Sequence, residues 1–149
     1  MGWLARNGYT VIPFSRLDAF LEGREPLPPK SVVITIDDGY RATHEIAFPI
    51  LRKYGFPATL FLYTDFVGAP DALTWAQMRE MIAAGTFAVQ PHSKSHSNLA
   101  VRHADENEAR YRERVNADRE LAVIGDWFTT TFTLTFGEQR YALKVERGR

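Results

Sequence analysis

Residues 32–36 read Val-Val-Ile-Thr-Ile, a run that is apolar or β-branched at every position. Such a run is typical of a strand that is covered on both faces of a parallel sheet. Residues 58–63 and 87–90 are similar short segments, and helical patterns follow the three in turn, at 42–54, from the N-cap Thr74 to Gly85, and at 105–124. Because strands and helices alternate, the sequence predicts an α/β fold with a parallel sheet and right-handed crossovers.

The composition is that of one soluble globular domain, with 149 residues, of which 45% are hydrophobic and 24% charged. Lys+Arg and Asp+Glu are 18 each, so no net charge attracts nucleic acid. Cysteine is absent, which excludes disulfides and thiolate ligands. Residues 1–8 lack the basic and apolar segments of a signal peptide, and no run approaches the roughly 18 apolar residues of a membrane span. The chain as written is therefore expected to stay in the cytoplasm.

The pattern changes near Thr129. Apolar residues alternate with threonine over residues 131–136, a second alternating segment covers 141–146, and Gly137 lies between the two. Alternation of this kind predicts an amphipathic β-hairpin with one side facing solvent. The sequence therefore divides into residues 1–125, which carry the strand–helix alternation, and residues 126–149, a tail of different character.

Four residues with metal-binding or acid–base chemistry follow the predicted strands. Asp37 and Asp38 come directly after the first strand, and His92 and His96 come after the third. The carboxyl ends of parallel strands form the edge where α/β proteins build active sites, so we expect these side chains to lie close together. Two imidazoles four residues apart face the same way on a helical turn and can chelate one ion. With one carboxylate as a third ligand and the other as a base, the pattern predicts a metal-dependent hydrolase.

Each motif alone also has a simpler interpretation. Asp-Asp-Gly is typical of a turn with a solvated acidic pair, and two histidines in a polar segment are often surface residues. A zinc protease of the His-Glu-x-x-His type is excluded, because Ser93 stands where the glutamate is needed. Two imidazoles and one carboxylate also suit a non-haem iron oxygenase, although that site would leave Asp37 without a role.

Taken together, the two motifs resemble those of the polysaccharide deacetylase family, also called the NodB-homology domain or carbohydrate esterase family 4. Its acidic motif, Thr-[Phe/Ile/Trp]-Asp-Asp-Gly, matches Thr35 to Gly39, and its histidine motif, His-[Ser/Thr]-x-x-His, matches His92 to His96. The likeness extends over about residues 3–125. Within the family the chain most resembles the branch that de-N-acetylates poly-N-acetylglucosamine in biofilm matrices.

The resemblance implies an incomplete distorted (β/α) barrel of the NodB-homology type, with the tail as a C-terminal β-hairpin. It implies that Asp38, His92 and His96 bind a divalent metal, usually Zn²⁺, and that Asp37 is the catalytic base. The implied partner is an N-acetylated amino-sugar polysaccharide, from which the reaction releases acetate.

The chain departs from the family pattern after Gly125. Family members continue into motifs that line the groove and supply a general-acid histidine, whereas this chain has no proline after Pro91 and no histidine after His103. A complete barrel of this type needs about 250 residues. We therefore expect impaired deacetylation, with a non-catalytic metal- or glycan-binding remnant as the alternative. We also expect self-association wherever the sheet edges stay open.

Overall fold

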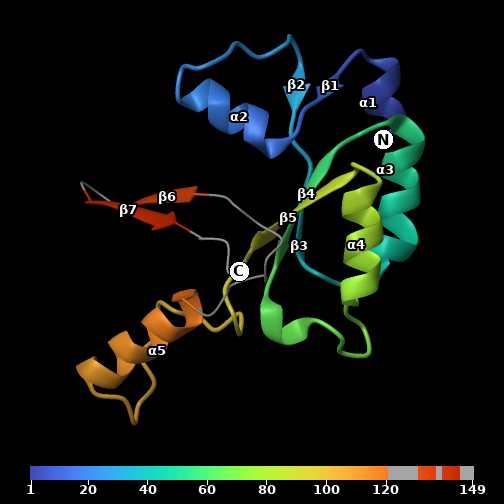
Figure 1. Cartoon of the computed structure of the whole chain (residues 1–149). Helices are drawn as coiled ribbons and strands as arrows, with labels where there is room; N and C mark the ends of the chain where they lie inside the picture. Colours follow the sequence, from blue (N-terminus) through green and yellow to red (C-terminus); the bar gives the residue numbers. More distant parts are fainter. Residues whose placement is uncertain (121–130, 137–138, 145–149) are drawn as a thin grey trace.

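The computed structural model describes residues 1–120, 131–136 and 139–144, and Figure 1 shows the arrangement of their helices and strands. The elements are α1 (Gly2–Arg6), β1 (Thr10–Val11), α2 (Phe14–Leu21), β2 (Ser31–Val32), β3 (Thr35–Asp38), η1 (Thr43–Ala47), α3 (Phe48–Tyr54), β4 (Ala58–Leu62), η2 (Thr64–Phe66), α4 (Trp75–Ala83), β5 (Phe87–Pro91), α5 (Glu108–Glu120), β6 (Thr131–Phe136) and β7 (Gln139–Lys144). The strands β3, β4 and β5 form a parallel sheet with β4 in the centre. The predicted α/β class with parallel strands is confirmed.

The run at residues 32–36 forms two strands, where the sequence predicted one. β2 pairs with β1, whereas β3 pairs with β4 in register Thr35↔Thr59. The chain changes partners at Ile34, whose carbonyl oxygen already accepts a hydrogen bond from Thr59 N at 2.9 Å. One uninterrupted apolar run therefore contributes strands to two separate sheets. Its hydrophobic pattern does not determine which neighbouring strand each part pairs with.

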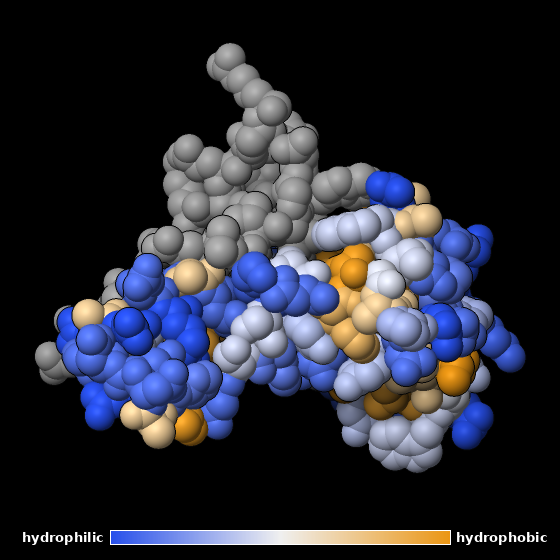
Figure 2. All heavy atoms as spheres, turned by 90° about the horizontal axis from the view of Figure 1, so that it is seen from below, coloured by the Kyte–Doolittle hydropathy of each residue, from blue (hydrophilic) through white to orange (hydrophobic). Residues whose placement is uncertain are grey.

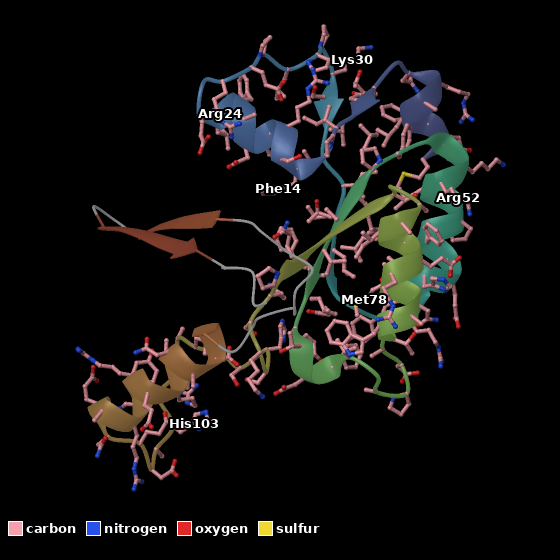
Figure 3. All side chains as sticks on the ribbon, in the orientation of Figure 1. Phe14, Arg24, Lys30, Arg52, Met78 and His103 are labelled. Carbon is pink, nitrogen blue, oxygen red and sulfur yellow. The ribbon has the colours of Figure 1, made fainter. Side chains whose placement is uncertain are left out.

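The core lies between the three-stranded sheet and the helices α3 and α4, which Figure 1 shows together on one side of the sheet. Leu60 in β4, Val89 in β5 and Met81 in α4 are fully buried. Met78, also buried, lies between α4 and the sheet (Figure 3). The apolar character of residues 58–63 and 87–90 is thus explained by packing against these helices, which fixes the positions of the strand ends.

The helix predicted from Thr74 begins as expected. Thr74 Oγ1 accepts a hydrogen bond from Gln77 N at 3.3 Å, and the Gln77 side chain accepts one from Thr74 N at 2.9 Å. This reciprocal capping box satisfies two backbone donors that the first turn of a helix leaves free. No helix among the described residues is long and apolar enough to cross a membrane.

The sheets do not close within the described residues. β3 and β5 are the edges of the three-stranded sheet, and no pairing among residues 1–120, 131–136 and 139–144 joins the sheets into a barrel. β6 and β7 pair with each other in antiparallel register, Thr131↔Lys144 to Phe136↔Gln139. The predicted turn at residues 137–138 and the predicted boundary at residues 125–126 lie outside the described residues.

Gly39 is the last residue of the acidic motif, directly after β3, and has a positive φ of 93°. A Cβ at this position would overlap Leu62 Cδ1 in the central strand. We expect Gly39→Ala to lower the free energy of unfolding by about 2 kcal/mol more than Gly8→Ala does, as measured by denaturant titration. Gly8 is a matched control, because its φ of 68° is also positive but a Cβ added there would meet nothing within 4 Å. Equal losses in the two variants would contradict the predicted overlap.

Candidate metal centre

Asp37 and Asp38 end β3 with opposite exposure. Asp37 is exposed and Asp38 is half-buried, as expected for neighbouring residues whose side chains alternate along a strand. Asp38 has a positive φ of 73°, a conformation that is uncommon for a residue other than glycine. Its Oδ1 atom is buried and has no hydrogen-bond partner. A buried carboxylate oxygen without a partner is energetically unfavourable and indicates a site for a ligand.

His92 and His96 lie in the loop that follows β5. His92 N donates to Leu62 O at 2.7 Å and thereby ties the start of this loop to the end of β4. The loop is not helical, and the expectation of a helical turn is wrong. The chain instead turns through positive φ values at Ser93 (73°) and His96 (56°), and His96 N donates to Ser93 Oγ at 2.9 Å. The two imidazoles converge by this route, with ring centroids 5.2 Å apart.

The structure brings Asp38, His92 and His96 together as one group. Asp38 Oδ1 lies 3.3 Å from His96 Nε2 and 3.9 Å from His92 Nε2, and one ligand atom from each residue lies within 4.8 Å of the other two. Ligand atoms about 2 Å from a tetrahedral zinc ion are about 3.3 Å apart. The three ligand atoms are therefore spread more widely than those of a formed zinc site. Between 26% and 50% of each side chain is exposed, so a substrate can reach the group.

Tyr63 is a residue of this site that the sequence analysis missed. It directly follows β4, and its ring lies against the His96 ring with centroids 5.1 Å apart. Burial raises the pKa of the Tyr63 phenol, and so does the negative charge of Tyr40 and of Asp38. The phenol thus remains a hydrogen-bond donor at neutral pH. Its position at the end of the strand predicted at residues 58–63, like the positions of Asp38 and His92 at other strand ends, was the signal available in the sequence.

Asp118 in α5 holds the histidine loop and was also missed. Its side chain is only 4% exposed, and Oδ1 accepts hydrogen bonds from Ser95 N at 2.7 Å and from Ser95 Oγ at 2.5 Å. The backbone oxygen of Asp118 accepts another from Lys94 N at 3.0 Å. The sequence contained a sign of this inward position, because Tyr111, Val115 and Asp118 are spaced so that they lie on one face of a helix.

We expect Asp118→Ala to weaken metal binding about 10-fold, within the range found when outer partners of metal ligands are removed. The reason is that the loop loses the acceptor that holds the backbone between the two histidines. Competition with a coloured chelator measures the dissociation constant. Glu113→Ala, at an exposed position of the same helix, is the control. An Asp118→Ala affinity equal to that of the control would contradict the positioning role.

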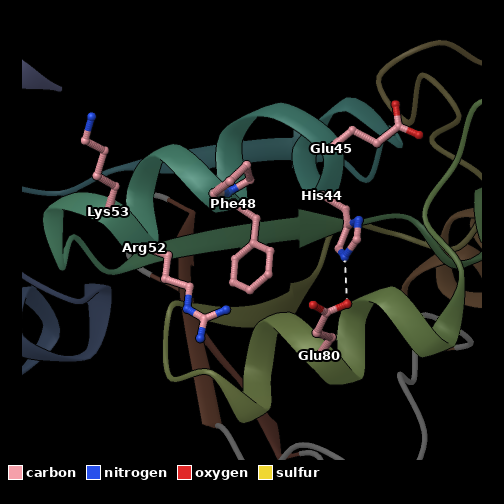
Figure 4. A pocket seen from close by; sticks show the side chains of 7 residues that line it. His44, Glu45, Phe48, Arg52, Lys53 and Glu80 are labelled. Carbon is pink, nitrogen blue, oxygen red and sulfur yellow. Dashed lines mark hydrogen bonds and ion pairs between the residues drawn. The ribbon is translucent and has the colours of Figure 1, made fainter.

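A second concave region lies away from this group. It has a volume of about 640 Å³ and is lined by His44, Glu45, Phe48, Pro49, Arg52, Lys53 and Glu80. Figure 4 shows His44 pointing from η1 to Glu80 in α4, with Nε2 and Oε2 2.9 Å apart. None of the three metal-binding candidates lines this region. His44 thus connects two helical segments.

Comparison with known proteins identifies the family. The model of the family described as "Polysaccharide deacetylase" matches residues 24–145. The putative polysaccharide deacetylase YxkH of Bacillus subtilis is 35% identical over 99 residues, which cover 66% of this chain and 35% of YxkH. The poly-beta-1,6-N-acetyl-D-glucosamine N-deacetylase of Escherichia coli K12 is 31% identical over 106 residues, covering 61% of this chain and 16% of that protein.

Solved structures of the same kind have a similar fold. The BpsB deacetylase domain from Bordetella bronchiseptica superimposes with a TM-score of 0.65 at 27% identity, covering 78% of this chain and 58% of that domain. IcaB from Ammonifex degensii superimposes with a TM-score of 0.69 at 26% identity, covering 80% of this chain and 54% of that structure. The chain thus spans little more than half of these structures and about a third of YxkH. Since the family model matches most of its residues, the chain belongs to the polysaccharide deacetylase (NodB-homology) family.

Proposed function

We propose that this chain forms the metal-binding part of an enzyme that removes N-acetyl groups from an N-acetylglucosamine-containing polysaccharide. The observation that carries the proposal is the buried, unpartnered Oδ1 of Asp38, which faces two imidazole nitrogens at 3.3 and 3.9 Å. The proposed fold is an incomplete barrel over residues 1–125, followed by a separate tail over residues 126–149.

The proposed ligands Asp38, His92 and His96 fit a divalent ion, and we propose Zn²⁺. Two imidazole nitrogens and one carboxylate oxygen, with further positions open to solvent, are a donor set typical of catalytic zinc. A divalent ion held there supplies Lewis acidity, which acidifies water and polarises an amide carbonyl. The two histidines present Nε2 toward Asp38, and the backbone turn at Ser93 fixes their relative orientation.

Asp37 is the proposed base. It precedes Asp38 in β3, and its exposed carboxylate is available to a water molecule at the strand end. Asp37 takes one proton as the water oxygen bonds to the acetamide carbon. As the carbon–nitrogen bond breaks, the nitrogen takes the proton held by Asp37, and the acetic acid formed loses its remaining proton to the solvent or to the amine, so that acetate and a free amine result. The carboxylates have separate roles because two of them doing the same work at close range would not both remain ionised.

The proposed substrate class rests on the relatives. Those from Escherichia coli and Staphylococcus aureus are named as N-deacetylases of poly-beta-1,6-N-acetyl-D-glucosamine. Since the chain covers only 16% and 27% of these two proteins, the substrate is a proposal for this chain. A β-1,6-linked N-acetylglucosamine oligomer is the first substrate to test.

The second candidate function is binding of metal and glycan without turnover. The remaining histidines favour it, because both form pairs outside the metal group. His44 Nε2 lies 2.9 Å from Glu80 Oε2, and His103 Nδ1 lies 4.0 Å from Glu106 Oε1. Neither histidine belongs to the group formed by Asp38, His92 and His96, so neither is positioned at that group to protonate the leaving nitrogen.

One experiment separates the two candidates. The metal content of the purified chain is measured together with acetate release from a β-1,6-linked N-acetylglucosamine pentamer. Stoichiometric metal with acetate release supports the enzyme, and metal without acetate release supports the binding function. A chain that takes up no divalent metal contradicts both.

A further inference from the structure

Three aromatic rings form a continuous group beside the candidate metal centre. The Tyr63 ring stacks on Phe66 at 5.1 Å between centroids and 11° between planes, and Tyr40 meets Phe66 edge-on at 5.0 Å. On its other side Tyr63 contacts the imidazole of His96 at 5.1 Å. We call Tyr40, Phe66 and Tyr63 the aromatic shelf. It connects directly to the proposed metal ligands.

We propose that the aromatic shelf binds a sugar ring of the polysaccharide, next to the sugar whose acetamide group is placed at the metal centre. This inference rests on the proposed function and adds a binding subsite to it. Its occupant is a pyranose unit, whose faces of C–H groups pack on aromatic rings and whose hydroxyl groups exchange hydrogen bonds with phenols.

The exposure of Tyr40 is the first argument. Tyr40 is 51% exposed, although burial of its aromatic ring would stabilise the folded protein. The exposure does not come from a loose segment, because Tyr40 forms a β-bridge with Ala72 and the neighbouring Gly39 O accepts a hydrogen bond from Leu73 N at 2.9 Å. A ring held in solvent by an anchored backbone is suited to contact a ligand.

The surface around the shelf is the second argument. Viewed from below, hydrophobic atoms gather on the side of η2 and α4, whereas the side of α5 is mainly hydrophilic (Figure 2). One ion pair lies next to Phe66 in the chain, with Lys94 Nζ 2.6 Å from both carboxylate oxygens of Asp65. Aromatic rings accompanied by a few polar groups are typical of a small-ligand site and suit a sugar ring.

The position of the phenols is the third argument. The Tyr63 ring lies against the His96 ring with centroids 5.1 Å apart, and His96 Nε2 lies 3.3 Å from Asp38 Oδ1, so the shelf borders the proposed metal ligands. A sugar on the shelf is therefore placed next to the sugar whose acetamide group reacts. The shelf should consequently increase the affinity for oligomers and have little effect on a single N-acetylglucosamine.

The test is a calorimetric titration of the whole chain with a β-1,6-linked N-acetylglucosamine pentamer and, separately, with N-acetylglucosamine. We expect Tyr40→Ala to weaken pentamer binding about 10-fold, which corresponds to 1.4 kcal/mol. Tyr40→Phe retains the ring and loses only the hydroxyl group. It is expected to weaken pentamer binding by no more than about 3-fold, which corresponds to the loss of one hydrogen bond. The control Trp3→Ala removes a 58% exposed ring from α1 and should leave binding unchanged. Tyr40→Leu keeps apolar volume without a flat ring and replaces Tyr40→Ala if that variant does not fold.

The outcomes separate the shelf from the proposed chemistry. Loss of pentamer affinity in Tyr40→Ala, with normal metal content, supports the shelf whether or not acetate is released. Pentamer binding that is equal in the wild type and in Tyr40→Ala overturns the shelf, even if acetate release proves the enzyme function. Wild-type binding of the pentamer no tighter than that of the monomer overturns it as well.

Discussion

Replacing His92 and His96 together by alanine will abolish stoichiometric metal binding. These residues contribute two of the three ligand atoms that lie within 4.8 Å of one another, and Asp38 alone cannot hold an ion in competition with water. Metal at 100 times its dissociation constant stabilises the fold by about 2.7 kcal/mol. Its addition should therefore raise the melting midpoint of the wild type by roughly 5–10 °C and leave the double variant unchanged.

The matched control is His103→Ala. His103 is an exposed histidine that precedes α5 and lies outside the metal group. Its replacement should retain both the metal content and the thermal shift of the wild type. Metal analysis of the dialysed proteins and thermal denaturation with and without added Zn²⁺ are the measurements. Full metal content in the His92→Ala, His96→Ala double variant would show that the ion is bound elsewhere.

The convergence of the metal group was predictable because it follows from topology. Asp38 and His92 are 54 positions apart, but Asp38 ends β3, His92 follows β5, and β4 pairs with both strands. The carboxyl ends of these strands must meet at one edge whatever the loops between them do. Strand–helix alternation is encoded by short-range hydrophobic patterns, so the sequence was sufficient for this conclusion.

The local geometry of the histidine loop was not predictable in the same way. The spacing of His92 and His96 suggested a helical turn, yet the chain passes through positive φ at Ser93 and at His96. Positive φ in residues other than glycine persists only where surrounding contacts impose it. Here the contacts come from Asp118, which is 22 residues after His96, and from Leu62 in another strand. Contacts at such separation leave no short-range pattern in the sequence.

The division of residues 32–36 into two strands has a similar cause. Residues 32–36 are apolar or β-branched throughout, and no glycine or proline at Val33 or Ile34 marks a boundary between two strands. The change of partner depends on where β1 and β4 lie, which is a property of the assembled fold. Tyr63 and Tyr40, in contrast to this change of strand partner, could have been predicted. Both lie at strand ends, so the argument that identified Asp38 as a site residue applies to them as well.

Asp37→Asn is expected to remove acetate release while the metal stays bound. The substitution keeps the size and shape of the side chain but removes its charge and its ability to take a proton from water. General acid–base catalysis contributes typically 10²–10⁴-fold, so the rate should fall by at least about 100-fold. The metal content should not change, because Asp37 is outside the group formed by Asp38, His92 and His96.

The wild-type rate is expected to be low already, because the sequence lacks the general-acid histidine that later family motifs supply, and general acid–base catalysis contributes typically 10²–10⁴-fold. The assay therefore needs a sensitive acetate readout and a long incubation with the pentamer. Asp105→Asn, at an exposed position before α5, is the control and should retain the wild-type rate. A rate in Asp37→Asn equal to that of this control would assign the base to another residue. Rapid deacetylation by the wild-type chain would instead show that side chains such as Tyr40 or His44 supply the groups that the later family motifs provide elsewhere.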